Sequence, residues 1–234
     1  MKALLQRWLT PRPVLDAQQS ARLSAWLALP EIDRAAGLGH ARCVVVDVET
    51  TGLNLMTDSL ISIGAVGVIN GRIALGDRFS VVLQQSTVSR RENILVHGIS
   101  GSAQREGEPP AAALLSFLEY LGKDPLVAFH VTFDETMIGR AIRHYLGFRF
   151  RHPWLDLAYV LPALFPERMH SHRSLDDWSD HFSIPHEYRH DAMSDALATA
   201  QLFLVAINAA ARKGIASHAG MRNLEHEYRS ARGI

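Results

Sequence analysis

Two acidic residues, Asp47 and Glu49, follow directly on a short apolar run at residues 43–46. The run is unbroken and rich in valine, which is typical of a strand buried on both faces of a sheet. Because side chains two positions apart in a strand share a face, both carboxylates should point the same way and lie close together. Neighbouring carboxylates either share a proton or hold a divalent cation, and oxygen ligands favour Mg²⁺ or Mn²⁺. The alternative, that both reach solvent where the strand ends, is common for so short a motif.

The four residues after this pair are Thr50, Thr51, Gly52 and Leu53. They supply hydroxyls, a flexible glycine and free backbone N–H groups immediately beside the acids. The sugar and terminal phosphate of a nucleotide could be seated on such groups.

Two further acidic positions follow later in the chain. Asp134 comes just after an apolar run at 126–129, at the start of a predicted helix, where an acid is also favoured simply as a cap. His190 precedes the last long helix and Asp195 lies in its first turns, so both can face one point. Asp191 and Ser194 are alternative caps for the same helix.

Four carboxylates in one pocket would repel one another strongly without cations. Two divalent ions remove this repulsion and create a site suited to phosphoryl transfer, in which the metals clamp the attacking and leaving oxygens. His190 then fits the role of a general base, because imidazoles titrate near neutral pH.

The surrounding pattern predicts the elements that must position these residues. Residues 60–69 and 72–83 read as strands joined by a tight turn at Asn70-Gly71, and 126–129 and 154–156 as short strands. Helices are predicted over 111–120, 134–145, 158–165, 174–181 and 193–212. Strands that alternate with helices after an antiparallel start indicate an α/β or α+β domain with a mixed sheet.

Composition and length indicate a globular domain with an extension at each end. The chain has 234 residues, 24 basic and 24 acidic side chains, and 47% hydrophobic residues, which excludes a disordered or low-complexity chain. Residues 1–40 are predicted to be a helical extension, 41–212 the main domain, and 213–234 a loosely held polar tail. The apolar stripe of the extension is expected to pack on the main domain; the alternative is a surface for a partner or a second copy.

The expected location is the cytoplasm. A single cysteine, Cys43, allows no intramolecular disulfide, so nothing requires an oxidising compartment. Gln6, Arg7 and Pro11 interrupt the apolar start that a signal peptide would need. No uncharged stretch approaches the roughly 20 apolar residues of a transmembrane helix, so no membrane contact is expected.

Four blocks of this sequence, in order, resemble the DnaQ-like, or DEDDh, superfamily of 3′→5′ exonucleases, the family of the proofreading subunit of the bacterial replicative polymerase. The matching blocks are residues 46–53, 96–100, 126–134, and 190–195 continuing through Thr199 and Ala200. Together they cover the chain from about Arg42 to Ala211 at family-like spacing.

The resemblance implies a ribonuclease-H-like fold, a mixed five-stranded sheet flanked by helices. It implies that Asp47 bridges two metal ions, that Glu49 and Asp195 complete the shell of the first, and that Asp134 holds the second. His190, in place of a tyrosine, puts the chain in the histidine branch.

The same resemblance implies where substrate would bind. The segment of Thr51, Gly52 and Leu53 would receive the 3′-terminal nucleotide, and His97 and Ile99 would lie near its base and sugar. Relatives commonly carry His-Asn-Ala where this chain has Phe129-His130-Val131. His130 could replace the asparagine as a polar support near the substrate, or could alter which substrates fit.

The function predicted on this basis is two-metal-ion hydrolysis of terminal phosphodiesters in single-stranded or frayed DNA, releasing nucleoside 5′-monophosphates. RNA trimming by the same chemistry and a catalytically silent nucleic-acid-binding module are the alternatives, and a polymerase or other protein partner is possible. The zero net charge predicts modest, metal-dependent affinity for a few terminal nucleotides, because tracking along a duplex requires many cationic contacts.

Overall fold

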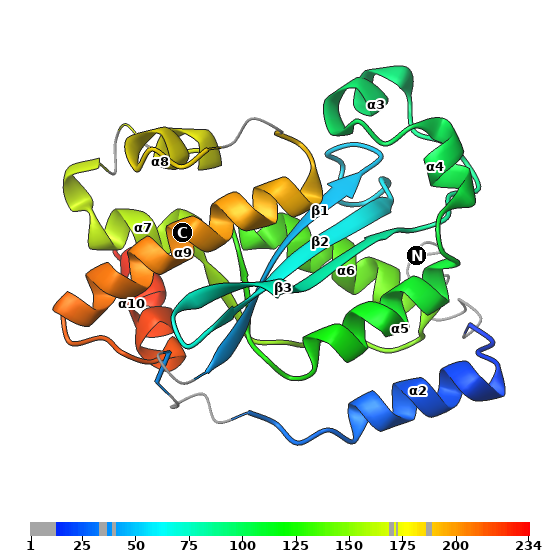
Figure 1. Cartoon of the computed structure of the whole chain (residues 1–234), viewed down its shortest axis with the longest axis horizontal. Coiled ribbons are helices and arrows are strands. Elements are labelled where there is room, and N and C mark those ends of the chain that lie inside the picture. Colours follow the sequence, from blue (N-terminus) through cyan, green and yellow to red (C-terminus); the bar gives the residue numbers. More distant parts are fainter. Residues whose placement is uncertain (1–12, 33–36, 39–40, 169–170, 172, 186–188) are drawn as a thin grey trace, which may run out of the picture.

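A five-stranded mixed sheet forms the centre of the computed structural model, which describes residues 13–32, 37–38, 41–168, 171, 173–185 and 189–234. The strands are β1 (Arg42–Thr50), β2 (Leu60–Ile69), β3 (Arg72–Val82), β4 (Leu126–Ala128) and β5 (Trp154–Asp156). Their order is β3-β2-β1-β4-β5 (Figure 1). The first three are antiparallel neighbours, and β4 and β5 continue the sheet in parallel with β1. The predicted mixed five-stranded sheet is confirmed.

The turn between β2 and β3 forms where the sequence predicts it. Asn70 and Gly71 have φ values of 53° and 67°. This left-handed backbone matches the twist of a hairpin and suits asparagine and glycine.

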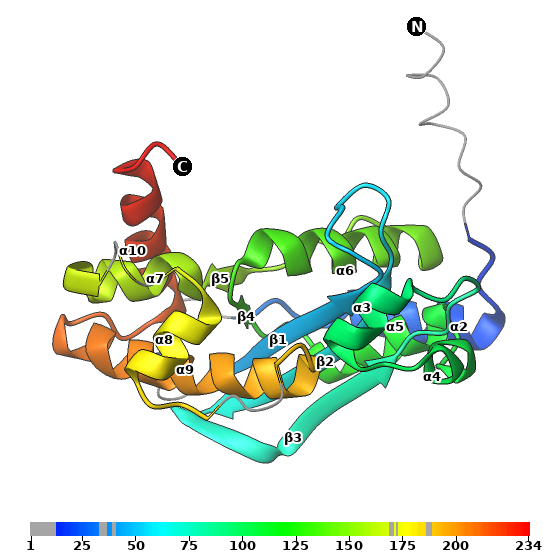
Figure 2. The same cartoon turned by 90° about the horizontal axis from the view of Figure 1, so that it is seen from above.

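Helices connect and cover the strands. They are α2 (Ala17–Leu27), α3 (Arg91–His97), α4 (Gly101–Glu106), α5 (Pro110–Leu121), α6 (Val131–Tyr145), α7 (Leu157–Leu164), α8 (Leu175–His181), α9 (Ala192–Arg212) and α10 (His218–Ser230), with a 3₁₀ turn at Pro166–Arg168. Figure 2 shows α6 and α9 on opposite sides of the sheet.

Alternation along β1 divides the core into two layers. Val44 and Val46 pack into the apolar cluster that contains α5 and α6. Cys43 and Val45 face the other way, into the cluster of α7, α8 and α9. Odd-numbered positions of β1 therefore face α9, and this decides where Asp47 and Glu49 point.

The predicted loosely held tail is wrong, because residues 218–230 form α10. Its Met221 is fully buried, and α10 packs against α7 and β5. The apolar pattern of this helix is weak because polar contacts also hold it on the domain. The Asp156 backbone N–H donates to buried Glu225, and Arg222 donates to the Trp154 carbonyl. The helices α3 and α4 were not predicted either, since each is too short to show a periodic pattern.

The helix expected in the N-terminal extension is α2, and part of its apolar stripe packs on the main domain, whereas Leu27 and Leu29 are exposed. Trp26 is 4% exposed and joins the same cluster as α5 and α6, with Leu15 and Leu23 partly buried beside it. The Trp26 Nε1–H donates to the Gly122 carbonyl at 2.8 Å. Residues 1–12, 33–36 and 39–40 of the predicted extension lie outside the described residues.

Within the described ranges, α9 alone has the length and apolar composition of a membrane-spanning helix. It packs against β1 and β2, and 56% of its apolar window is buried inside the domain. Packing in the core accounts for its composition.

Candidate active site

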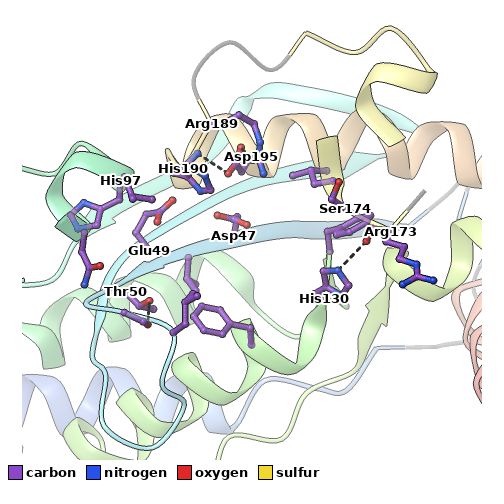
Figure 3. A pocket seen from close by; sticks show the side chains of 18 residues that line it. Asp47, Glu49, Thr50, His97, His130, Arg173, Ser174, Arg189, His190 and Asp195 are labelled. Carbon is purple, nitrogen blue, oxygen red and sulfur yellow. Dashed lines mark hydrogen bonds and ion pairs between the residues drawn. The ribbon is translucent and has the colours of Figure 1, made fainter. Parts of the chain in front are cut away.

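Three carboxylates meet at the end of β1. Asp47 and Glu49 from β1 and Asp195 from the first turn of α9 each offer an oxygen, and the three oxygens lie within 4.8 Å of one another. Figure 3 shows them converging on one side of the sheet. Glu49 and Asp195 are nearly 150 residues apart in the sequence. They come together only because α9 packs on the sheet.

The close approach of α9 depends on Gly64. In the β1–β2 pairing Gly64 lies opposite Asp47. A Cβ atom placed on Gly64 would lie 2.3 Å from the backbone carbonyl carbon of Ala192, in the first turn of α9. Sequence reasoning missed this residue, although a glycine within a β-branched strand is a signal of close backbone approach.

Burial and mutual repulsion raise the pKa values of these acids. The pKa of Asp47 is raised well above its ordinary value, first by burial and then by the charges of Asp134, Asp195 and Glu49. Burial, followed by the charges of Asp195 and Asp191, raises the pKa of Glu49 to about 8. The carboxylates of the cluster repel one another, and they offer only oxygen ligands. Both properties suit a divalent cation such as Mg²⁺ or Mn²⁺.

Asp134 lies beside this group and outside it. It is 4% exposed in the first turn of α6 and contributes to the raised pKa of Asp47. Burial also raises the pKa of Asp134, although backbone amides, including that of Val48, favour its charged form. Asp134 stands in the first turn of α6, and it is not among the three carboxylates whose oxygens lie within 4.8 Å of one another.

His190 stands at the rim of the cluster in a left-handed backbone conformation, with φ 62°. Its backbone N–H donates to Asp195 Oδ2 at 3.1 Å, and its ring lies beside the carboxylates (Figure 3). Left-handed backbone is uncommon in a residue with a side chain and tends to persist at functional sites. The helix cap that competed for this region is Asp191, which accepts from the Ser194 N–H at 2.9 Å.

The acids open into a pocket of about 560 Å³. Of the predicted substrate-binding residues, Thr50, Gly52, Leu53, His97 and His130 line it, whereas Thr51 and Ile99 are not among its lining residues. Sequence reasoning missed the remaining contributors to the wall, which are Val48, Asn93, Val96, Phe129, Phe133, Arg173, Ser174, Leu175 and Arg189.

Thr51 is directed into its own loop, which explains its absence from the pocket wall. Its hydroxyl donates to Asp58 Oδ1 at 2.9 Å, while the Thr50 hydroxyl donates to the Gly52 carbonyl at 2.7 Å. A side chain on Gly52 would meet Asp58 Oδ2 at 2.6 Å. The loop thus leaves Leu53, which is 87% exposed, at the mouth of the pocket.

Both ring nitrogens of His97 are used by its surroundings. Nδ1 accepts from the Ile99 backbone N–H at 3.0 Å, so Nε2 carries the proton and faces the Ser89 hydroxyl at 3.3 Å. Burial lowers the pKa of His97. His97 can therefore present its ring to the pocket while it also holds the end of α3 in place.

His130 joins two parts of the wall. Its Nε2 lies 3.2 Å from the Arg173 carbonyl (Figure 3). Its backbone N–H donates to Asp156 Oδ1 at 3.0 Å. Buried Asp156 also accepts from the Val131 and Ala158 N–H groups, both at 3.0 Å. Asp156 thereby fixes the start of α6, the helix that carries Asp134.

Arg189 brings a positive charge into direct contact with the acidic cluster. Its guanidinium forms ion pairs with Asp195 and with Asp176 of α8. Nothing in the sequence around Arg189 signals these contacts, because Asp176 and Asp195 lie on different helices.

Comparison with known proteins gives this geometry its context. A family model described as exonuclease, RNase T, matches residues 44–203. The chain belongs to this exonuclease family. The resemblance, the fold and the enzyme class predicted from the motifs are confirmed.

Several bacterial relatives of this exonuclease domain are far longer proteins. The PolC-type DNA polymerase III of Bacillus subtilis is 32% identical over 176 residues, which is 75% of this chain and 12% of that protein. A DNA polymerase III subunit epsilon-like protein of Rhodobacter capsulatus is 30% identical over 74% of this chain and 24% of its own length. The chain thus spans less than a quarter of the length of these curated relatives.

Solved structures support the exonuclease fold. E. coli exonuclease I in complex with a dT13 oligonucleotide aligns with a TM-score of 0.63 and 18% identity, over 74% of this chain and 42% of that one. Exonuclease X in complex with 5′ overhanging duplex DNA aligns with a TM-score of 0.60 and 18% identity, over 78% of this chain and 99% of that one.

Proposed function

We propose that this protein removes nucleotides one at a time from the 3′ ends of single-stranded or frayed DNA, releasing nucleoside 5′-monophosphates. The observation that carries the proposal is the convergence of Asp47, Glu49 and Asp195 beside His190 at the end of an open pocket. Membership of the exonuclease family and the DNA named with two structural neighbours support the same substrate class.

In this proposal Asp47, Glu49 and Asp195 would hold one divalent cation, and Asp134 would help Asp47 to hold a second. Bound cations would lower the pKa of the attacking water and neutralise charge that develops on the phosphate. His190 accepts the proton of that water on an unprotonated ring nitrogen, and the backbone link to Asp195 keeps His190 at the rim. The leaving 3′ oxygen stays with the shortened strand.

The pocket wall orients the terminal nucleotide. Exposed Leu53 and Val96 offer apolar surface to a base, and the Thr50 to Gly52 turn offers backbone groups to the sugar. Arg173, exposed on the opposite wall, is placed to meet a phosphate further along the strand.

The test compares Glu49→Gln with Glu92→Gln, an identical change at an exposed site on α3. With Mg²⁺ or Mn²⁺ and a 5′-labelled oligonucleotide, Glu49→Gln should slow degradation by about 100-fold or more, and Glu92→Gln should leave it unchanged. His190→Gln should lose about 10²–10⁴-fold in rate, the range of general base catalysis. Full activity of Glu49→Gln or His190→Gln would refute this mechanism.

Substrate preference is tested with wild-type protein on three substrates of matched sequence. We expect single-stranded DNA and mismatched duplex ends to be shortened from the 3′ end, with mononucleotides as product and RNA degraded more slowly. Faster degradation of RNA would instead assign the RNA-trimming alternative. No degradation of any of the three would assign a nucleic-acid-binding role without catalysis.

A further inference from the structure

Arg189 is the only basic residue of the described part of the chain that is paired with a member of the three-carboxylate group. It precedes His190 directly in the sequence, and its side chain is 24% exposed. Asp195, which it contacts, has a side chain only 7% exposed. The ion pair therefore lies where water screens charge poorly, so the attraction between the two side chains is stronger than it would be on the open surface.

The same guanidinium has a second partner outside the cluster. It contacts Asp176 of α8, whose side chain is 49% exposed at the rim. One cation thus bridges an inner carboxylate of the site and an outer carboxylate of a different helix. Arginine suits this arrangement because its planar fork can donate to two acceptors at once.

We infer that Arg189 is a resident counter-cation of the carboxylate cluster, which neutralises Asp195 while no metal is bound and gives up that carboxylate when a divalent cation binds. Asp176 keeps the guanidinium at the rim after the exchange. This inference rests on the proposed function, because it takes Asp47, Glu49 and Asp195 to be the metal ligands.

The physical reason is competition for one carboxylate. Three carboxylates with oxygens within 4.8 Å of one another repel strongly, and the guanidinium of Arg189, paired with the 7%-exposed side chain of Asp195, offsets part of that negative charge. A metal that binds the same oxygen atoms must displace the guanidinium from Asp195. The favourable energy of that ion pair is then lost, and metal binding is weaker by this amount. Arg189 therefore sets the metal concentration at which the site fills.

A simple structural ion pair would behave differently. If Arg189 only held α8 against α9, its removal would loosen Asp195 and weaken metal binding. Competition predicts the opposite sign, since removal of Arg189 frees a ligand. The direction of the change in metal affinity separates the two roles.

Arg173 is the matched control. It lines the same pocket and is exposed, and its backbone bonds to His130 and Asp177 do not depend on the guanidinium. Arg173→Gln removes the same charge from the same pocket wall without touching the cluster. It reports the effect of overall pocket charge alone.

The experiment measures Mn²⁺ binding to EDTA-treated, dialysed protein by the electron paramagnetic resonance signal of free Mn²⁺. Arg189→Gln should lower the half-saturating Mn²⁺ concentration roughly tenfold relative to wild type. Arg173→Gln should change it by less than about twofold, because an exposed charge is screened by solvent. The metal-free Arg189→Gln protein should also melt at a lower temperature than wild type, and Mn²⁺ should raise its melting temperature by more.

Arg189→Lys is the second variant, in case Arg189→Gln folds poorly. Lysine keeps the charge but cannot hold both carboxylates with a fork, so its half-saturating concentration should fall between wild type and Arg189→Gln. Unchanged or weaker Mn²⁺ binding by a folded Arg189 variant would overturn the inference while leaving the proposed function intact. Wild-type protein that binds no Mn²⁺ would overturn both.

Discussion

Two non-glycine residues of the pocket, His130 and His190, have left-handed backbones, with φ values of 66° and 62°. Each precedes the helix that carries an acid of the site, α6 with Asp134 and α9 with Asp195. In each case the backbone N–H donates to a carboxylate, Asp156 or Asp195, and this bond holds the unusual conformation. Local strain is thus stabilised by the same groups that organise the site.

Other histidines serve stability, and His152 is the clearest case. It is half-buried, its Nε2 lies 2.6 Å from the Asp124 carbonyl, and its ring stacks on Phe150. Burial is the largest cause that lowers its pKa below the ordinary 6.5. The folded protein therefore binds this proton less readily than the unfolded chain does.

This shift predicts a pH dependence of stability. Because the unfolded state gains the proton first, the contribution of His152 to the free energy of unfolding should fall as pH drops below about 6.5, and should go on falling until the lowered pKa is reached. His152→Gln keeps a donor for the Asp124 carbonyl but cannot titrate, so between pH 7 and 5 its free energy of unfolding, measured in urea, should rise relative to that of wild type. Exposed His144→Gln is the control and should retain the wild-type slope. An unchanged slope in His152→Gln would show that this group does not carry the effect.

At the scale of elements, the site depends on how closely α9 approaches β2. Only the absence of a side chain at Gly64 allows this contact, and Gly64 lies opposite Asp47 in the sheet. The neighbouring backbone belongs to the helix that carries Asp195, so a shift there moves a carboxylate of the cluster. Precision in the site is therefore set by helix-to-sheet packing.

Gly64→Ala should consequently damage both stability and activity. We expect a loss of about 1–3 kcal/mol from overpacking, measured by urea unfolding, and at least about a tenfold loss of nuclease rate in protein that is still folded. Gly139→Ala on α6 is the matched control, because a Cβ there meets nothing within 4 Å. It should stabilise the protein by up to about 1 kcal/mol without changing the rate. Wild-type activity in Gly64→Ala would mean that α9 can shift without cost.

At the scale of the whole molecule, the terminal helices α2 and α10 belong to the domain they flank. Trp26 of α2 packs against Phe148 and Phe150 and donates to the Gly122 carbonyl, while Glu225 of α10 bonds the backbone of Asp156. The two helices pack on different parts of the domain, α2 against α5 and α10 against α7 and β5 (Figures 1 and 2). We therefore expect one cooperative unfolding transition for the domain and both helices.

Trp26→Ala tests this expectation. It should cost about 3–5 kcal/mol of unfolding free energy, the usual cost of truncating a buried aromatic side chain, and still unfold in one transition. Nuclease rate per folded molecule should stay at the wild-type value, because the described residues that line the pocket include none from α2. Leu27→Ala on the same helix is 52% exposed before truncation and should change stability by no more than about 0.5 kcal/mol. Separate melting of an N-terminal segment would contradict the single transition.

The sequence by itself indicated which residues meet in the candidate site and on which kind of element each of them stands. The Asp47 and Glu49 pair could be predicted because strand alternation is a local rule, and His190 and Asp195 because helix spacing is one. The hairpin at Asn70 and Gly71 followed from turn chemistry in the same way. Each of these inferences needs only neighbours within a few positions.

Only the tertiary structure decided how those pieces meet. The pairing of Arg189 with Asp195 and Asp176, the contact of Gly64 with α9, and the docking of Glu225 on β5 all join segments that are distant in the chain or on separate elements. Such contacts depend on strand register and on the depth at which a helix settles on a sheet, and neither quantity is written in local periodicity. The charge balance of the site is for this reason a property of the fold.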